Sequence, residues 1–119
     1  MLSEPEIEQR LPVWHALSDI FLDTELQSND YQWIAGVLAR SGYPHDELRF
    51  IFENEVAPAF IVNLLSVAGE WTSWSEDEAR QIMLRSLASR FPPLRWMRKR
   101  LARRVVAEEW PKIAPMLAD

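Results

Sequence analysis

Helical spacing of apolar residues runs through almost the whole chain, and only three glycines among 119 residues interrupt it. Amphipathic helices repeat apolar side chains every three or four residues, whereas half-buried strands alternate every second residue. No segment of useful length follows the strand period, and no internal repeat breaks the helical pattern. The sequence therefore predicts an all-α protein, a compact bundle of five to seven helices.

Capping residues and helix breakers divide this pattern. Ser3 with Glu6, and Ser75 with Glu78, have the spacing of capping boxes, which satisfy free backbone N–H groups at a helix start. Gly42 stands where a left-handed C-cap is usual. The expected helices cover about residues 4–22, 31–40, 44–56, 58–68, 76–90 and 94–109.

The fourth of these helices, opened by Pro58 and closed by Gly69, is apolar on almost every side. A helix that is hydrophobic all round is usually buried. We therefore expect residues 58–68 to form the central, most buried element.

Length and composition indicate a single soluble domain covering residues 1–119. A chain of this size supports one core, and 48% hydrophobic residues exclude a disordered chain. The absence of cysteine excludes disulfides and thiolate chemistry. The N-terminus lacks the basic start of a secretory signal, and no apolar run is long enough to span a membrane. The expected location is the cytoplasm.

Charge divides the domain into an acidic body and a basic helix. Residues 1–90 carry 15 acidic side chains against 6 arginines, whereas residues 91–119 carry 7 basic against 3 acidic ones. The acidic body covers about residues 1–90 and the basic C-terminal helix about residues 94–109. Surfaces of opposite sign indicate charged partners, or a body folded back against its own helix.

The basic helix combines cations with an aromatic side chain, a combination that suits phosphate and base contacts or an anionic membrane surface. Long basic side chains also cover neighbouring apolar surface, and a net charge of −5 argues against a general nucleic-acid binder. A narrow apolar stripe is expected to dock on the bundle; if exposed, it would equally suit a homodimer interface. The cations are Arg95, Arg98, Lys99, Arg100, Arg103 and Arg104 around Trp96, and the stripe is Leu94, Met97, Leu101 and Val105.

Two charged residues fall on apolar helix faces. Glu55 lies between Leu48, Ile51 and Phe52 on a helical wheel, and Arg80 lies among the apolar residues of the fifth helix. The pattern predicts a buried Glu55–Arg80 ion pair, or pairing of each with another group. A general acid built on Glu55 is the less favoured alternative.

No catalytic motif accompanies these features. His15, Asp19 and Asp23 share one helix face at a spacing that a metal or acid–base site uses, but a stable site needs further ligands, and a solvated face explains them as well. Nucleotide-binding, hydrolase and metalloprotease motifs are absent. The sequence predicts no catalytic residue, no metal site and no cofactor.

Two tryptophans stand in the linker before the fifth helix. Trp71 is expected in the core, while Trp74 is equally compatible with a core position and with an exposed anchor at an interface.

Residues 10–75 resemble a small bacterial family of uncharacterised all-helical proteins, whose members are similar in size and acidity to immunity proteins. The resemblance rests on residues 14–25, 41–43, 55–58 and 63–71. It implies no activity and no catalytic residues.

These features favour a non-enzymatic protein-binding module, a bacterial immunity protein that neutralises a basic toxin. An acidic surface speeds encounter with a cationic partner, and aromatic anchors supply affinity. The alternative is a nucleic-acid-associated regulator that uses the basic helix. The predicted partner-binding residues are the acids Asp19, Asp23, Glu25, Asp30 and Glu53 and the aromatic residues Trp74 and Trp96.

Overall fold

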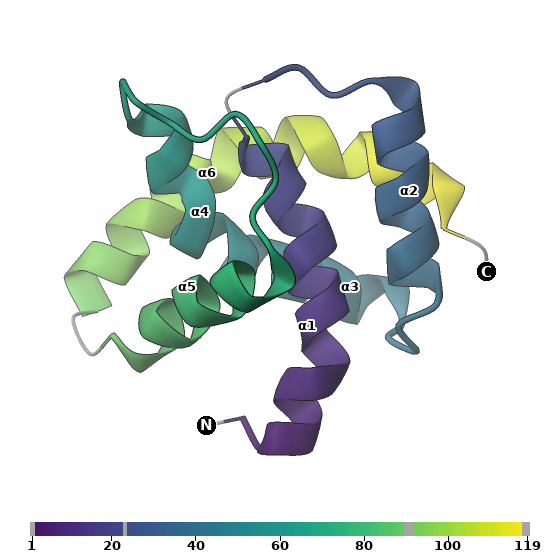
Figure 1. The fold of residues 1–119 in the computed structure, drawn as a ribbon, viewed down its shortest axis with the longest axis horizontal. Coiled ribbons are helices and arrows are strands. Elements are labelled where there is room, and N and C mark those ends of the chain that lie inside the picture. The colour runs from purple at the N-terminus through teal and green to yellow at the C-terminus, as the bar shows by residue number, and fades with distance from the viewer. Residues whose placement is uncertain (1, 23, 90–91, 118–119) are drawn as a thin grey trace.

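The computed structural model describes residues 2–22, 24–89 and 92–117, and these residues confirm the all-α prediction. They contain six α-helices joined by loops and short helical turns, and no strand (Figure 1). The elements are α1 (Glu4–Ser18), the 3₁₀ turn η1 (Asp19–Phe21), α2 (Ser28–Ala39), α3 (His45–Ile51), the π-helical turn η2 (Phe52–Val56), α4 (Ala57–Leu65), α5 (Glu76–Ala88), α6 (Pro92–Ile113) and the 3₁₀ turn η3 (Ala114–Met116).

α1 packs against α2, α5 and η2, while α4 and α6 form the most extensive contact between two helices. In Figure 1, α1 runs between α5 on one side and α2 on the other, and the long α6 passes behind it. α6 packs against α4, η2 and α2, so the basic helix is docked on the body. Among the described residues, no helix has both the length and the apolar character that crossing a membrane requires.

Four fully buried aromatic side chains form the centre of the core. Trp14 comes from α1, Phe21 from η1, Phe52 from η2 and Phe60 from α4. Each such side chain contributes about 1.5–3 kcal/mol by leaving water. The core therefore connects helices from the N-terminal, middle and C-terminal parts of the chain, since Phe52 also contacts Trp110 of α6.

The chain does not break at Pro58, contrary to expectation. α3, η2 and α4 form one continuous helical segment, residues 45–65, with the wider π turn directly before the proline. Pro58 has no N–H for the Asn54 carbonyl four residues earlier, and its ring crowds that group. Arg95 of α6 fills the gap, since its Nη2 donates to the Asn54 oxygen at 2.9 Å.

The prediction of a buried central helix over residues 58–68 is correct only for its first half. Ala57 to Ile61 are buried, but the helix ends at Leu65, and Val62, Leu65 and Val67 are exposed. The last turn and the loop after it project past the neighbouring helices (Figure 1). Apolar composition alone does not reveal where a helix runs out of neighbours to pack against.

α6 docks through a different face from the one predicted. Met97 and Leu101 of the expected stripe are about half exposed, while Ala102, Val106 and Trp110 are buried. The buried residues lie four apart, so they share one side of the helix, and buried Ile113 extends that side. The helix continues past the expected end at residue 109, and these later side chains decide which face points inward.

Candidate functional site

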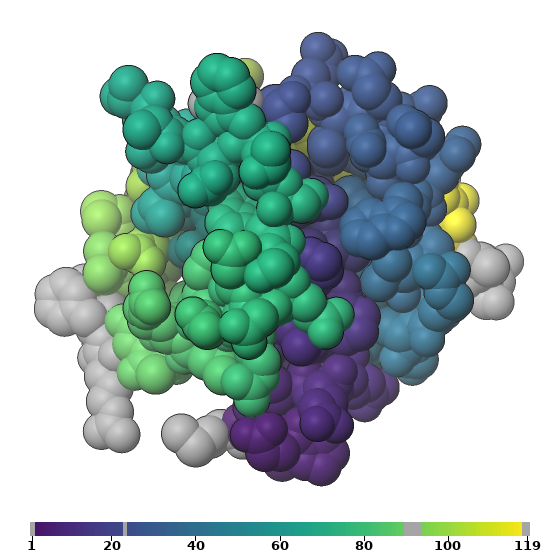
Figure 2. Space-filling model, in the orientation of Figure 1, coloured from purple at the N-terminus to yellow at the C-terminus, as the bar shows by residue number. Residues whose placement is uncertain are grey.

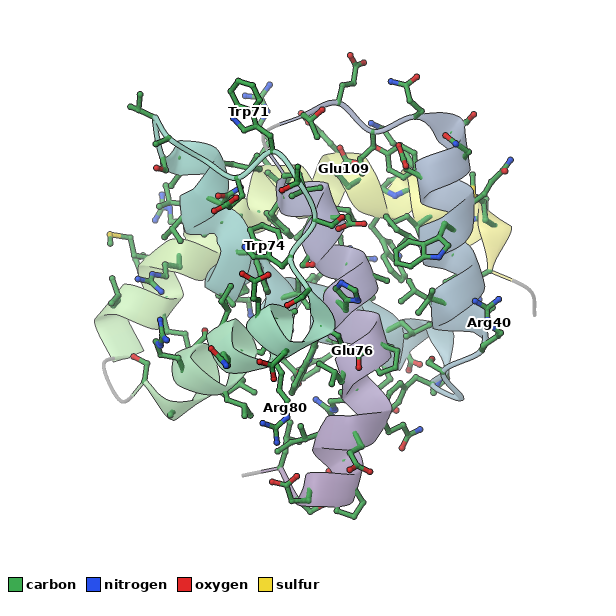
Figure 3. All side chains as sticks on the ribbon, viewed as in Figure 1. Arg40, Trp71, Trp74, Glu76, Arg80 and Glu109 are labelled. Atoms are coloured by element: carbon green, nitrogen blue, oxygen red, sulfur yellow. The ribbon has the colours of Figure 1, made fainter. Side chains whose placement is uncertain are left out.

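Four large apolar side chains are exposed at the end of α4 and in the loop that follows it. These are Val62, Leu65, Val67 and Trp71, and we call them the apolar tip. Figure 3 shows Trp71 at the top of the molecule, pointing away from the body. Exposed apolar groups that gather on one part of a surface commonly mark an interaction site.

The structure contradicts the core position expected for Trp71 and resolves the two alternatives left open for Trp74. Trp71, expected in the core, is 70% exposed, whereas Trp74 is only 9% exposed. The ring of Trp74 packs edge-on against Phe60, with centroids 4.8 Å apart. Trp74 is therefore a core residue rather than a partner-binding anchor, and Trp71 is the exposed one.

Asn63 of α4 holds the part of the loop that precedes Trp71 in the chain. Its Nδ2 donates to the carbonyl oxygens of Phe21, at 2.7 Å, and Glu70, at 3.3 Å. Its Oδ1 accepts from the backbone N–H of Glu70 at 2.7 Å. One amide side chain thus satisfies both backbone groups of the residue directly before Trp71.

Two residues at the end of the first helix hold the part of the loop that follows Trp71 in the chain. His15 Nε2 lies 2.7 Å from the Trp74 carbonyl oxygen, which can only accept, so Nε2 carries the hydrogen. The Ser73 hydroxyl donates to Asp19 Oδ1 at 2.8 Å. Because the loop is fixed on both sides, Trp71 is displayed by an ordered backbone, which lowers the entropy cost of binding.

The stripe of His15 and Asp19 therefore has a structural role. Asp23, its third member, lies outside the described residues. Within the described part of the chain, no three His, Asp or Glu side chains are grouped closely enough to hold a metal ion.

The other acids predicted to form one binding face are separated. Asp30 caps α2 by accepting from the Gln27 N–H at 2.8 Å, and Glu25 is exposed in the neighbouring loop. Glu53 lies elsewhere, where it accepts from Arg49 at 2.6 Å and borders Lys99 and Arg103 of the basic helix. The predicted acidic face is therefore wrong for Glu53, because its helix turn points toward α6.

Acidic residues nevertheless lie on one side of the apolar tip. Residues 62–79 contain four acids and no basic residue, and so do residues 19–30. The Ser73–Asp19 hydrogen bond joins these two segments, and Figure 2 shows them in teal and blue on the same side of the molecule. The tip thus has acidic segments on the side of Trp71, while Val62 at its other end borders a cavity with Arg85 and Arg98.

Asp19 gives stability a pH dependence. Burial raises the pKa of its carboxyl, Asp30 adds to that rise, and the Ser73 hydrogen bond and His15 oppose it. The folded state then binds this proton more tightly than the unfolded state, so its contribution to stability falls as pH rises from the ordinary aspartate pKa to the raised one.

We therefore expect Asp19→Asn to melt at the same temperature as wild type or a few degrees higher at neutral pH. The amide oxygen still accepts from Ser73, and no charge has to be buried. This advantage disappears once Asp19 itself is protonated. Melting temperatures across the acidic range test the prediction, with Glu25→Gln as the control for removing one negative charge. A variant that melts below wild type at neutral pH would contradict it.

The buried acid predicted from the helical wheel is confirmed, and the second of the two predicted alternatives holds, because Glu55 and Arg80 each pair with another group. Glu55 is buried and pairs with Arg10 of α1, and the Trp14 indole N–H donates to its other oxygen at 2.9 Å. Burial works to lower the pKa of Arg10, but the hydrogen bond and charge of Glu55 raise it. Arg80 lies beside the first turn of α1 (Figure 3), where it pairs with Glu4 at 3.4 Å.

The basic helix divides into inward and outward cations. Arg95 is partly buried and donates to the carbonyl oxygens of Ser86 and Asn54, so it fastens the helix to the body. Arg98 is also partly buried, and the other four cations are exposed. Trp96 is exposed as predicted, and the Arg100 guanidinium lies 5.5 Å from its ring centre.

Comparison with known proteins gives a family without an activity. The family model described as a domain of unknown function, DUF7079, matches residues 8–116. No curated protein and no solved structure matches the chain.

Proposed function

Because the chain belongs to the DUF7079 family, whose function is unknown, its role must be inferred from its surface, and we propose that it is a non-enzymatic module that binds a cationic protein. The observation that carries this proposal is Trp71, an exposed tryptophan held in place from both sides. Tryptophan is enriched among the residues that dominate interface energies.

The acidic segments beside Trp71 define the partner's chemistry. The adjoining segments carry only acidic charges, so they attract a positively charged surface and speed its encounter with Trp71. Toxins that cleave nucleic acids are cationic because they bind phosphate. In its most specific form, we propose that the protein neutralises such a toxin, as immunity proteins do.

The second candidate function is association with nucleic acid through α6. It is supported by the exposed Trp96 beside Arg100, since base stacking on an aromatic ring next to cations is a common way to hold single strands. The docking of α6 and the overall charge of −5 favour the first candidate.

Trp71→Ala is expected to weaken binding of the protein partner about 30-fold or more, the loss that defines an interface hot spot. The fold is expected to be unchanged because the side chain is mostly exposed. The test is affinity capture of the tagged protein from its native cells, followed by measurement of the dissociation constant for the recovered partner.

Trp96→Ala is the matched control, because it removes an equally large exposed tryptophan from the opposite charge environment. A stoichiometric cationic protein that is lost with Trp71→Ala and kept with Trp96→Ala supports the proposal. Recovery of nucleic acid that is lost with Trp96→Ala selects the second candidate instead. A protein partner that binds both variants as tightly as wild type would show that the tip is not the docking site.

A further inference from the structure

A cavity of about 660 Å³ lies between α4, α5 and α6, which come together on one side of the molecule (Figure 1). Its size is that of an ordinary small-molecule site. Half of its lining residues are apolar: Phe60 and Trp74 lie at its base and are almost fully buried, and Val62 contributes exposed apolar surface. Ile82 and Leu94 extend this apolar surface onto α5 and α6.

Two arginines from different helices line the same cavity. Arg85 comes from α5 and Arg98 from α6, and no carboxylate is among the described residues that line it. Neither guanidinium lies within 4 Å of a carboxylate of any described residue. Arg95, one helix turn before Arg98, is occupied by two backbone carbonyls. The cavity is therefore bordered by two positive charges, on exposed Arg85 and partly buried Arg98, that no carboxylate of the described residues pairs with.

Positive charge inside a partly enclosed apolar site attracts and orients anions. Guanidinium groups bind carboxylate and phosphate oxygens in pairs, with hydrogen bonds stronger than those between neutral groups. The low dielectric of the surrounding apolar wall strengthens the attraction. The hydroxyl of Ser89 and the amide of Asn63 add polar groups at the edge, although Asn63 is already engaged with the loop.

We propose that this cavity binds a small organic anion, a carboxylate or a phosphate ester, whose apolar or aromatic body lies against Ile82, Leu94 and the accessible edge of Trp74. Arg85 and Arg98 hold the anionic group, and the apolar wall selects against bare inorganic anions. The cavity shares Val62 with the apolar tip, but Trp71 does not line it. The two proposals are therefore tested on different residues, and this one does not depend on the identity of a protein partner.

The indole N–H signals of the six tryptophans give a direct test by NMR, with Trp74→Phe identifying the signal of Trp74. Phenylacetate and phenyl phosphate are expected to shift the Trp74 signal, whereas neutral phenylacetamide shifts it far less. Arg85→Gln and Arg98→Gln are each expected to weaken phenylacetate binding about tenfold or more, the effect of losing one charged hydrogen bond.

Arg104→Gln is the matched control, because this exposed arginine of α6 pairs with Glu108 and does not line the cavity. Its affinity is expected to equal that of wild type. The dispersion of the indole signals shows in the same spectra that each variant is folded. Equal shifts with phenylacetate and phenylacetamide would overturn the proposal. So would wild-type affinity in both cavity variants, or no response of Trp74 to either anion.

Discussion

Arg10→Met is expected to lower the free energy of unfolding by about 3–5 kcal/mol, the loss seen when one partner of a buried ion pair is removed. The Glu55 carboxylate is buried and has two partners, Arg10 and the indole N–H of Trp14. Methionine fills much of the same volume but leaves this carboxylate in the core with only the indole N–H. Urea unfolding followed by circular dichroism at neutral pH measures the change.

Arg80→Met is the matched control for this prediction. Arg80 also pairs with a glutamate, Glu4 of α1, but this partner is largely exposed. Exposed ion pairs contribute about 0–1 kcal/mol to stability. The double variant Arg10→Met with Glu55→Gln is expected to be more stable than the sum of the single losses indicates, because the two groups are in direct contact. Equal losses for the two arginine variants, or additive losses in the cycle, would contradict the assignment of Glu55 to Arg10.

Local sequence signals predicted the starts of α1 and α5 correctly, because each begins with a capping box. Both capping boxes form as expected: the Ser3 hydroxyl accepts from the Glu6 N–H at 3.3 Å, and the Ser75 hydroxyl accepts from the Glu78 N–H at 3.1 Å. Gly42 has the positive φ of 87° that its place after the second helix requires. These features depend on residues within four positions of one another, so the sequence contains all the information they need.

Ion-pair partners were not predictable in the same way. The helical wheel places Glu55 on an inward face, but Arg10 precedes it by 45 residues in the chain. Which arginine reaches Glu55 depends on how α1 crosses η2, and nothing in the local pattern defines that crossing. An acidic residue on a buried helix face therefore indicates that it has a partner, but the sequence pattern does not identify that partner.

The apolar tip was missed for a related reason. Residues 62–67 continue an apolar run that begins in the core, and composition cannot show that the neighbouring helices end first. Trp71 and Trp74 stand in a loop, where no helical period indicates which side chain faces inward. The available signal was Asn63, a polar residue inside an apolar helix, because such a side chain commonly satisfies the backbone of a nearby loop.

Phe52→Ala is expected to destabilise the protein by about 3–5 kcal/mol, the usual cost of deleting a buried phenylalanine ring and leaving a cavity. The Phe52 side chain has no exposed surface. The centre of its ring lies 6.1 Å from the ring centre of Phe21 in η1 and 6.1 Å from that of Trp110 in α6. One side chain thus connects the π turn to an N-terminal and a C-terminal element. Because a domain of this size is stable by only about 5–15 kcal/mol, this loss is a large part of the total.

Phe50→Ala is the matched control, because it makes the same substitution two residues away in the same helical segment but at an exposed position. Phe50 is 54% exposed, and its loss is expected to change stability by about 0.5 kcal/mol or less. Urea unfolding of both variants, followed by circular dichroism, gives the comparison. Similar losses at the two positions would contradict the packing of η2 against α6. The same packing positions Arg95 and Arg98, so this result would also remove the structural basis of the cavity between α4, α5 and α6.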